Sequence, residues 1–442
     1  MTPKTEGQRG LAVLVAYFAP PAVGIAAQRV RATIRHLPEW GWDPVVVAPS
    51  AVHFHTDDAS MEALSGVRVV RTPNPEPSRW LRRLLGRGGG ARSEVPGGVA
   101  TVDAAESGPV SRVLRDAVRH WLYVPDAQLL WIPHAARAAA EALRGHDGPA
   151  VVFSSSVPYS AHFAARRAGR WTETPWVAEF RDPWSVSPPQ VGRTPAGRRL
   201  VDRRLEQGLV ATAQGLVVTS SGTAERYEEV FGHVMRTPAE VVRNGYEEVL
   251  PDAAPPPSGP MTLLYSGTLV EASFARPLLD ALERIWHDDP GAVFLDVYGP
   301  PGKWGEAGGQ PGAFLRLHGL VPPDEIPGHL VGSSALVLLQ PRREHAQYIA
   351  GKLYEYLGAR RPVVASLPWP CEASRLIEDH GELWRVERPD ADAFEGTLRR
   401  LLEAHRAGTL QGSRVPEATV APLSRRAQVR TLARIFDRVS GR

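Results

Sequence analysis

Cysteine is almost missing from this chain of 442 residues, since Cys371 is the only one. No intrachain disulfide can form, so we expect a reducing compartment such as the cytoplasm. Long hydrophobic runs are missing as well. The first apolar run, Leu11–Ala16, is too short for the core of a signal peptide or for a membrane span, and we interpret it as a buried strand.

Strong net charge is also missing. The formal net charge is +3 and the pI is about 9.1, which is too mild to indicate a nucleic-acid partner. The sequence has one HxxE spacing at 36–39 and one DxD spacing at 390–392, but we do not interpret these scattered residues as ligands of a cation, so we expect no metal. No GxGxxG follows the first predicted strand, which disfavours a dinucleotide oxidoreductase.

The composition is that of a globular protein, with 43% hydrophobic and 22% charged residues. The length favours two domains, because single cores stop growing well below this size. The segment Pro251–Pro260, PDAAPPPSGP, is the clearest linker. Strands alternate with helices on both sides of it, which predicts an α/β protein with two Rossmann-like parallel-sheet domains over residues 1–250 and 261–422.

The most informative stretch is residues 351–366, GKLYEYLGARRPVVAS, which predicts a short helix, a turn and a buried strand. Lys352 and Glu355 share one helix face, and Leu353 and Leu357 share another. A helix that starts Gly351-Lys352 suits a phosphate, and a carboxylate one turn later can accept hydrogen bonds from two vicinal ribose hydroxyls. These residues predict a nucleotide-diphosphate site, with an ordinary solvated helix face as the alternative.

Several segments together resemble the family-4-type glycosyltransferases of the GT-B fold. They are KLYEYLGARRPVVAS (352–366), YFAPPAVGIAAQRV (17–30), EFRDPW (179–184) and a strand followed by NGY (244–246). The resemblance implies two domains that face each other across a cleft, with a C-terminal helix over 423–442 that crosses back to the first domain. It also implies transfer of a sugar from a nucleoside-diphosphate sugar, such as a UDP-sugar, to a hydroxyl acceptor, with retention at the anomeric carbon. We expect no cofactor beyond that co-substrate.

In this family a glutamate at the place of Glu355 contacts the ribose, and a basic residue near Lys352 faces the diphosphate. Backbone groups around residues 318–321 hold the base, and a glycine loop such as that of Gly24 lies between donor and acceptor. Gln347 stands where relatives often have a second glutamate, so it could contact the sugar without supplying charge. The predicted donor-binding residues are Gly24, Gly267, Arg276, Val321, Gln347, Gly351, Lys352 and Glu355.

On the acceptor side, the strand Ala150–Phe153 ends in serines where many relatives place a histidine. His162, one turn into the next helix, could substitute, although a lone helical histidine is more often structural. Asp182 follows the strand Trp176–Phe180 and is the other candidate base, with a structural ion pair to its neighbour as the alternative. The residues assigned to the acceptor side are Ser155, Tyr159 and Arg181.

Other hypotheses stay open at this point. A nucleotide-sugar epimerase of the same fold would convert the donor without an acceptor, and a non-catalytic binding protein would bind the donor without turnover. The acceptor could be a small molecule, a glycan or a lipid-linked hydroxyl. The basic stretch 79–87 could touch an anionic membrane, although nine such residues more often form a surface helix, and residues 86–109 are expected to be a mobile loop.

Overall fold

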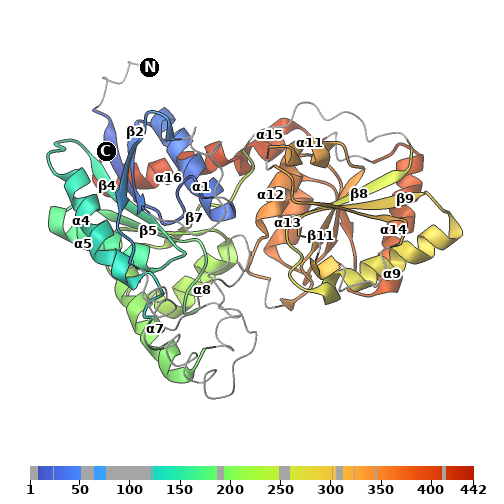
Figure 1. Ribbon diagram of the computed structural model, residues 1–442, viewed down its shortest axis with the longest axis horizontal. Helices are drawn as coiled ribbons and strands as arrows, with labels where there is room; N and C mark the ends of the chain where they lie inside the picture. The colour runs from blue at the N-terminus through green and yellow to red at the C-terminus, as the bar shows by residue number, and fades with distance from the viewer. Residues whose placement is uncertain are drawn as a thin grey trace, which may run out of the picture. The chain divides into compact units, whose positions relative to one another are not determined.

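The chain divides into two units in a computed structural model that describes residues 8–22, 24–50, 64–75, 121, 123–186, 194–247, 259–300, 302–304, 312–322, 324–343, 346–410 and 415–442. The first unit comprises Met1–Arg243 and Gln428–Arg442, and the second comprises Asn244–Ala427. Figure 1 shows both units in the colours of the chain. The predicted helix at 79–87 and the loop at 86–109 lie outside the described residues, as do residues 251–258 of the linker.

The first unit is built on a parallel sheet of seven strands in the order β3-β2-β1-β4-β5-β6-β7. The strands are β1 (Gly10–Val15), β2 (Trp42–Pro49), β3 (Arg68–Thr72), β4 (Ala150–Ser155), β5 (Trp176–Phe180), β6 (Gly215–Val218) and β7 (Ala239–Val241). The helices are α1 (Ile25–His36), α4 (Ile132–Leu143), α5 (Ser160–Thr172), α7 (Ala196–Val210), α8 (Ser221–Phe231) and most of α16 (Arg425–Ser440). The order reverses between β1 and β4.

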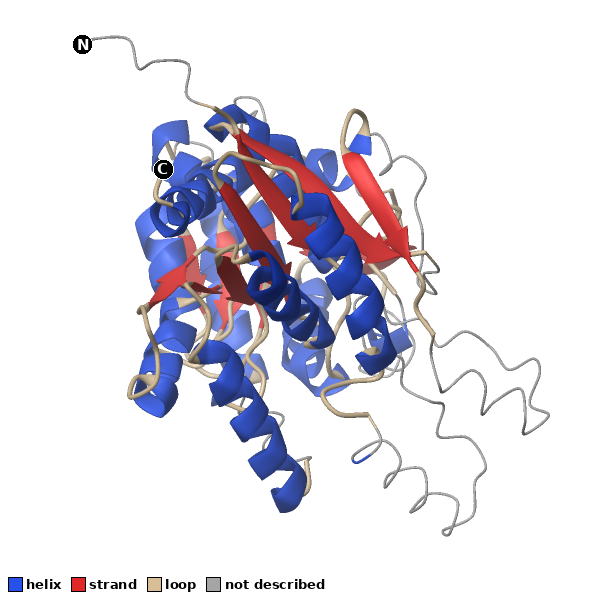
Figure 2. Ribbon diagram, turned by 90° about the vertical axis from the view of Figure 1, so that its left-hand side faces the viewer, coloured by secondary structure: helices blue, strands red, loops and turns tan. Residues whose placement is uncertain are grey.

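Helices cover both faces of this sheet, as Figure 2 shows. Val13 and Val15 of β1 belong to the core that α4, α5, α7 and α8 cover, whereas Ala12 and Leu14 belong to the core under α1 and α16. Both sets are buried because strand side chains alternate between faces. The strands of a parallel sheet that is buried on both faces therefore have the continuous apolar runs seen in the sequence.

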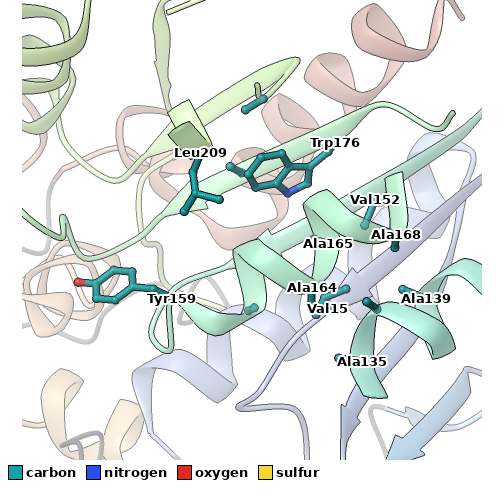
Figure 3. Packing of buried hydrophobic residues seen from close by; sticks show 14 of the residues in the cluster. Val15, Ala135, Ala139, Val152, Tyr159, Ala164, Ala165, Ala168, Trp176 and Leu209 are labelled. Atoms are coloured by element: carbon teal, nitrogen blue, oxygen red, sulfur yellow. The ribbon is translucent and has the colours of Figure 1, made fainter. Parts of the chain in front are cut away.

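Small side chains let α4 and α5 pack closely on the sheet. Figure 3 shows Ala135 and Ala139 of α4 beside Ala164, Ala165 and Ala168 of α5. All five are fully buried. An alanine-rich helix face has little side-chain bulk, so the helix backbones approach each other and the valines of the strands.

The second unit has a parallel sheet of six strands in the order β10-β9-β8-β11-β12-β13. The strands are β8 (Met261–Ser266), β9 (Val293–Tyr298), β10 (Leu315–Gly319), β11 (Ala335–Leu339), β12 (Val363–Ser366) and β13 (Leu383–Arg385). The helices are α9 (Ala272–Asp288), α11 (Ile326–Val331), α12 (Gly351–Gly358), α13 (Glu372–His380), α14 (Ala391–Arg406) and α15 (Glu417–Val420). Here the order reverses between β8 and β11.

Local sequence accounts for several of these boundaries. The Asp390 carboxylate accepts a hydrogen bond from the backbone N–H of Ala393 (2.8 Å) and so starts α14, and Ser220 caps α8 in the same way. On α12, Leu353 and Leu357 are buried as their spacing predicted. The C-terminal helix packs on the first unit, where Phe436 makes edge-to-face contact with Trp42 at 5.5 Å between ring centres.

Candidate functional site

The reversal of strand order in the second sheet is where ligands bind in open α/β folds, at the carboxyl ends of the strands. β8 ends there at Ser266, and Gly267 follows with φ of 95°, a backbone conformation that favours glycine. A Cβ atom at Gly299, which follows β9, would lie 2.3 Å from the carbonyl oxygen of Gly267. The backbones of the two loops after β8 and β9 therefore lie in direct contact.

Lys352 lies at this edge. Its Nζ is 3.6 Å from the centre of the Tyr265 ring and 3.5 Å from the position that a Cβ on Gly267 would take. Tyr356, on the same helix, accepts a hydrogen bond from the backbone N–H of Ser266 (3.0 Å), which ties α12 to the end of β8. The ammonium group and the first turn of α12 are thus held beside the glycine loop, as predicted for a diphosphate site.

Glu355 lies one turn further along α12 and its side chain is about one-third exposed, at 33%. The nearest cation given by the structure is Arg425, whose Nη2 is 3.9 Å from the Glu355 Oε1 and whose side chain is mostly buried. Arg425 also lies 3.5 Å from Glu247. The sequence did not mark Arg425 as a site residue, because it stands far from Glu355 along the chain.

Burial shifts the protonation of both groups on α12. It lowers the pKa of Lys352 from 10.5 to about 7, against the opposing effect of the Glu355 carboxylate. It raises the pKa of Glu355, against the opposing effects of Arg425 and then Lys352. A bound anion beside Lys352 would favour the ammonium form. Displaced pKa values of this kind are typical of ligand sites.

The other donor-binding residues predicted for the second unit are Arg276, Val321 and Gln347. Arg276 is not in the loop before α9 but one turn inside it, because the helix starts at Ala272, and its half-exposed side chain pairs with Asp280 at 2.8 Å. Val321 follows β10, and Gln347 lies in the segment between β11 and α12. Lys352 approaches Gly267 directly and shares α12 with Gly351 and Glu355, so the compact part of the site is Gly267, Gly351, Lys352 and Glu355.

An aromatic stack follows the ends of β9 and β10. The Tyr298 ring lies between His318 (4.4 Å, 7°) and His329 (4.3 Å, 24°). His318 Nε2 is also 2.6 Å from the Asp296 carboxylate. Both faces of Tyr298 are therefore covered, and the exposed ring at this edge of the sheet is His318, the first residue of the segment 318–321 that is predicted to hold the base.

In the first unit the order reverses between β1 and β4. Gly24 precedes α1 with φ of 103°, as expected of a glycine loop. One turn on, Arg29 binds the buried Glu179 of β5 through Nε and Nη2 (2.9 and 2.5 Å). The Ser155 hydroxyl donates to the other oxygen of Glu179 (2.6 Å). Ser155 is thus held by a buried ion pair that the sequence did not reveal.

The segment Arg181–Ser185 after β5 is fixed along its length. The carbonyls of its first three residues accept hydrogen bonds from Thr219 (3.0 Å), Ser156 (3.4 Å) and Tyr159 (3.2 Å). The backbone N–H groups of Trp184 and Ser185 donate to the fully buried Glu206 (3.3 and 2.8 Å). Asp182 remains half-exposed and pairs with Arg181 at 2.6 Å. A rigid loop therefore presents this carboxylate at the edge of the sheet.

Two residues predicted for the acceptor side belong to the core instead. His162 is fully buried, its Nδ1 is 2.8 Å from the Ser154 hydroxyl, and burial lowers its pKa to about 3. Tyr159 stacks on Trp184 at 4.5 Å and is 8% exposed. His162 faces inward because α5 turns that face to the core, whereas Tyr159 precedes α5 and packs on the segment after β5. Neither side chain is therefore placed to contact a substrate.

No group of three or more acidic, histidine or cysteine side chains that could hold a metal is found among the described residues. Within the same part of the chain, no helix combines the length and the apolar character needed to cross a membrane.

The comparisons with known proteins agree with this architecture. Residues 88–245 match the family model of the glycosyl transferase 4-like domain. No curated protein matches the sequence significantly. Among solved structures, a glycosyltransferase from Rickettsia africae ESF-5 is similar over 98% of both chains, with 12% identity and a TM-score of 0.63.

Two further solved structures show the same fold. Anabaena Alr3699/HepE, in complex with UDP and glucose, has 12% identity and a TM-score of 0.57 over 97% of this chain and 100% of that one. The lipopolysaccharide outer core galactosyltransferase WaaB has 14% identity and a TM-score of 0.54 over 96% and 98%. The chain therefore has the GT-B fold of these structures, and its residues 88–245 match a glycosyl transferase 4-like domain.

Proposed function

We propose that this protein transfers a sugar from a nucleoside-diphosphate sugar to a hydroxyl acceptor, with retention and without a metal ion. The observation that carries the proposal is the position of Lys352 at the start of α12, beside Gly267 and above the Tyr265 ring. The carboxylate of Glu355, one turn further along α12, would accept hydrogen bonds from the ribose hydroxyls. The UDP and glucose bound by the Anabaena protein support a donor of this class.

The reaction would break the bond between the anomeric carbon and the β-phosphate oxygen, and form one between that carbon and the acceptor oxygen. Negative charge grows on the leaving diphosphate, and the Lys352 ammonium with the first N–H groups of α12 would stabilise it. The acceptor proton would pass to the leaving phosphate on the same face of the sugar. A protein base is then not required, although the exposed carboxylate of Asp182 is available in the first unit.

The acceptor is proposed to bind at the carboxyl edge of the first sheet. The groups there are the Gly24 loop, the half-exposed Asp182 and its partner Arg181, all on backbone that neighbouring elements hold in place. A carboxylate and a guanidinium side by side can bind hydroxyl groups as acceptor and donor. These residues suit a polar, hydroxyl-bearing acceptor.

A panel of nucleotides tests the donor site. Thermal unfolding would be followed with UDP, GDP, ADP, TDP and NAD, each with and without a chelator. A nucleoside diphosphate at about 100 times its Kd should stabilise the protein by roughly 2.7 kcal/mol, and the shift should survive the chelator. A shift with NAD alone would favour an oxidoreductase, and a shift that the chelator abolishes would contradict the metal-free mechanism.

Binding of the diphosphate should depend on pH in one direction. In the protein without ligand, Lys352 has a pKa of about 7 and loses its proton as the pH rises. An anion binds the charged form of the side chain better. The Kd for UDP should therefore increase above pH 7, by at most about tenfold per pH unit, while the second pKa of a phosphate near 6 keeps the nucleotide ionised. Calorimetry between pH 7 and 9 measures this, and proton uptake should accompany binding.

The matched control is Lys352→Arg, because a guanidinium stays charged over this range. Its Kd for UDP should be nearly constant between pH 7 and 9. A wild-type Kd that is equally constant would show that Lys352 is not the group that meets the diphosphate.

A further inference from the structure

Two short segments of the second unit lie side by side against α12. They are Asn244–Glu247, where the chain enters this unit, and Leu423–Arg425, near the place where it leaves. Tyr246 pairs with Ser424 as a parallel bridge, and the backbone N–H of Arg425 donates to the Tyr246 carbonyl at 2.8 Å. The two segments therefore form one small structure rather than two independent loops.

Glycines make this contact close. A Cβ at Gly245 would lie 2.6 Å from the Leu423 carbonyl oxygen and 2.7 Å from the Arg425 nitrogen. A Cβ at Gly358, the last residue of α12, would lie 2.6 Å from the Tyr246 ring. No side chain fits at either position, so the helix that carries Glu355 is packed directly on the paired segments.

Arg425 extends from these segments to the acidic side chains around it. Its side chain is 12% exposed, and its two terminal nitrogens lie 3.5 Å from Glu247 and 3.9 Å from Glu355. A guanidinium this restricted offers a fixed fork of donors. The charge that acts most strongly on Glu355 is that of Arg425, ahead of Lys352.

We infer that Arg425 is a positioning residue, which keeps the Glu355 carboxylate ionised and aimed at the vicinal hydroxyls of the donor ribose. This inference rests on the proposed function of Glu355. Arg425 itself need not touch the nucleotide, and Glu247 holds its other side. The role is therefore specific: loss of Arg425 should impair recognition of the ribose and leave recognition of the diphosphate largely intact.

The experiment compares ribonucleoside diphosphates with their 2′-deoxy forms. Calorimetric Kd values would be measured for UDP and 2′-deoxy-UDP, and likewise for the adenosine and guanosine pairs. In the wild type the ribo form should bind more tightly, because a carboxylate accepts from both hydroxyls. Arg425→Met should weaken binding of the ribo form by about tenfold and reduce this preference, as should Glu355→Gln.

Four more variants sharpen the test. Arg425→Lys should restore part of the preference, since it keeps the positive charge. The double variant Arg425→Met/Glu355→Gln should be no worse than Glu355→Gln alone, because the arginine acts through the carboxylate. Arg426→Met, at the exposed neighbouring position, is the matched control and should change neither Kd. Lys352→Ala should weaken the ribo and deoxy forms equally.

The outcomes separate this inference from the proposed function. A preference for the ribo form that Glu355→Gln abolishes and Arg425→Met retains would overturn the positioning role and leave the donor site standing. Additive effects of the two substitutions would overturn it as well. If none of these diphosphates binds to the wild type, the proposed function falls, and the inference with it.

Discussion

Replacing Lys352 with alanine should weaken UDP binding by about 10- to 100-fold, because a hydrogen bond to a charged group contributes about 1.5–3 kcal/mol and 1.4 kcal/mol is tenfold. The side chain is the cation beside Gly267, at the reversal of strand order. The free energy of unfolding should stay the same or increase, since the substitution removes an ammonium group from a buried place. Calorimetry and chemical denaturation measure the two quantities.

The matched control is Arg406→Ala, which removes a half-exposed cation of the same unit near the opposite edge of the sheet, where the neighbouring His405 contacts the Gly259 carbonyl ahead of β8 (3.0 Å). It should leave the Kd unchanged within about twofold, because an exposed charge at the far edge of the sheet is largely screened by salt. If the Lys352 variant binds UDP with the same Kd as the wild type, the diphosphate binds at another place. An equal loss of affinity and of stability would instead make Lys352 a structural residue.

Replacing Arg29 with alanine should lower the free energy of unfolding of the first unit by about 3–5 kcal/mol, the usual cost of leaving a buried charge without its partner. Glu179 is 1% exposed, and Arg29 is its guanidinium partner. Arg29 also donates to the carbonyls of Val242 (2.8 Å) and Arg243 (2.7 Å), so the substitution leaves further acceptors without their donor. Urea denaturation of the full chain measures the change.

Two comparisons make this result specific. Arg9→Ala breaks a pair with Asp43 in which both side chains are about half exposed, and it should cost less than about 1 kcal/mol. The double variant Arg29→Met/Glu179→Gln should recover much of the loss, because it leaves no buried charge unpaired. A cost for Arg29→Ala as small as that for Arg9→Ala would mean that water reaches Glu179 in solution.

The donor side shows what local sequence can predict. The helix Gly351–Gly358, the buried Leu353 and Leu357 and the shared face of Lys352 and Glu355 follow from residue spacing alone. Each depends on residues within two helical turns of one another. The edge of the sheet where they meet Gly267 follows from the alternation of strands and helices, since parallel strands bring their carboxyl ends together.

The acceptor side shows what local sequence cannot predict. His162 has the residue type of a general base, and only the packing of α5 shows that it faces the core. The apolar and polar positions on an alanine-rich helix look alike, so the buried face could not be assigned beforehand. Similarly, Arg276 was predicted to bind the donor, and only the structure shows that it lies inside α9 and pairs with Asp280.

The sequence by itself determined the two α/β units, their parallel strands and the glycine-lysine start of α12, because periodicity, glycine positions and helix polarity act over a few residues. Only the tertiary structure decided which charges are brought together. Arg29 of α1 meets Glu179 of β5, Glu206 holds the Asp182 loop, and Arg425 faces Glu355. No short pattern encodes these pairs, because the energy of a charge depends on which distant residues exclude water from it.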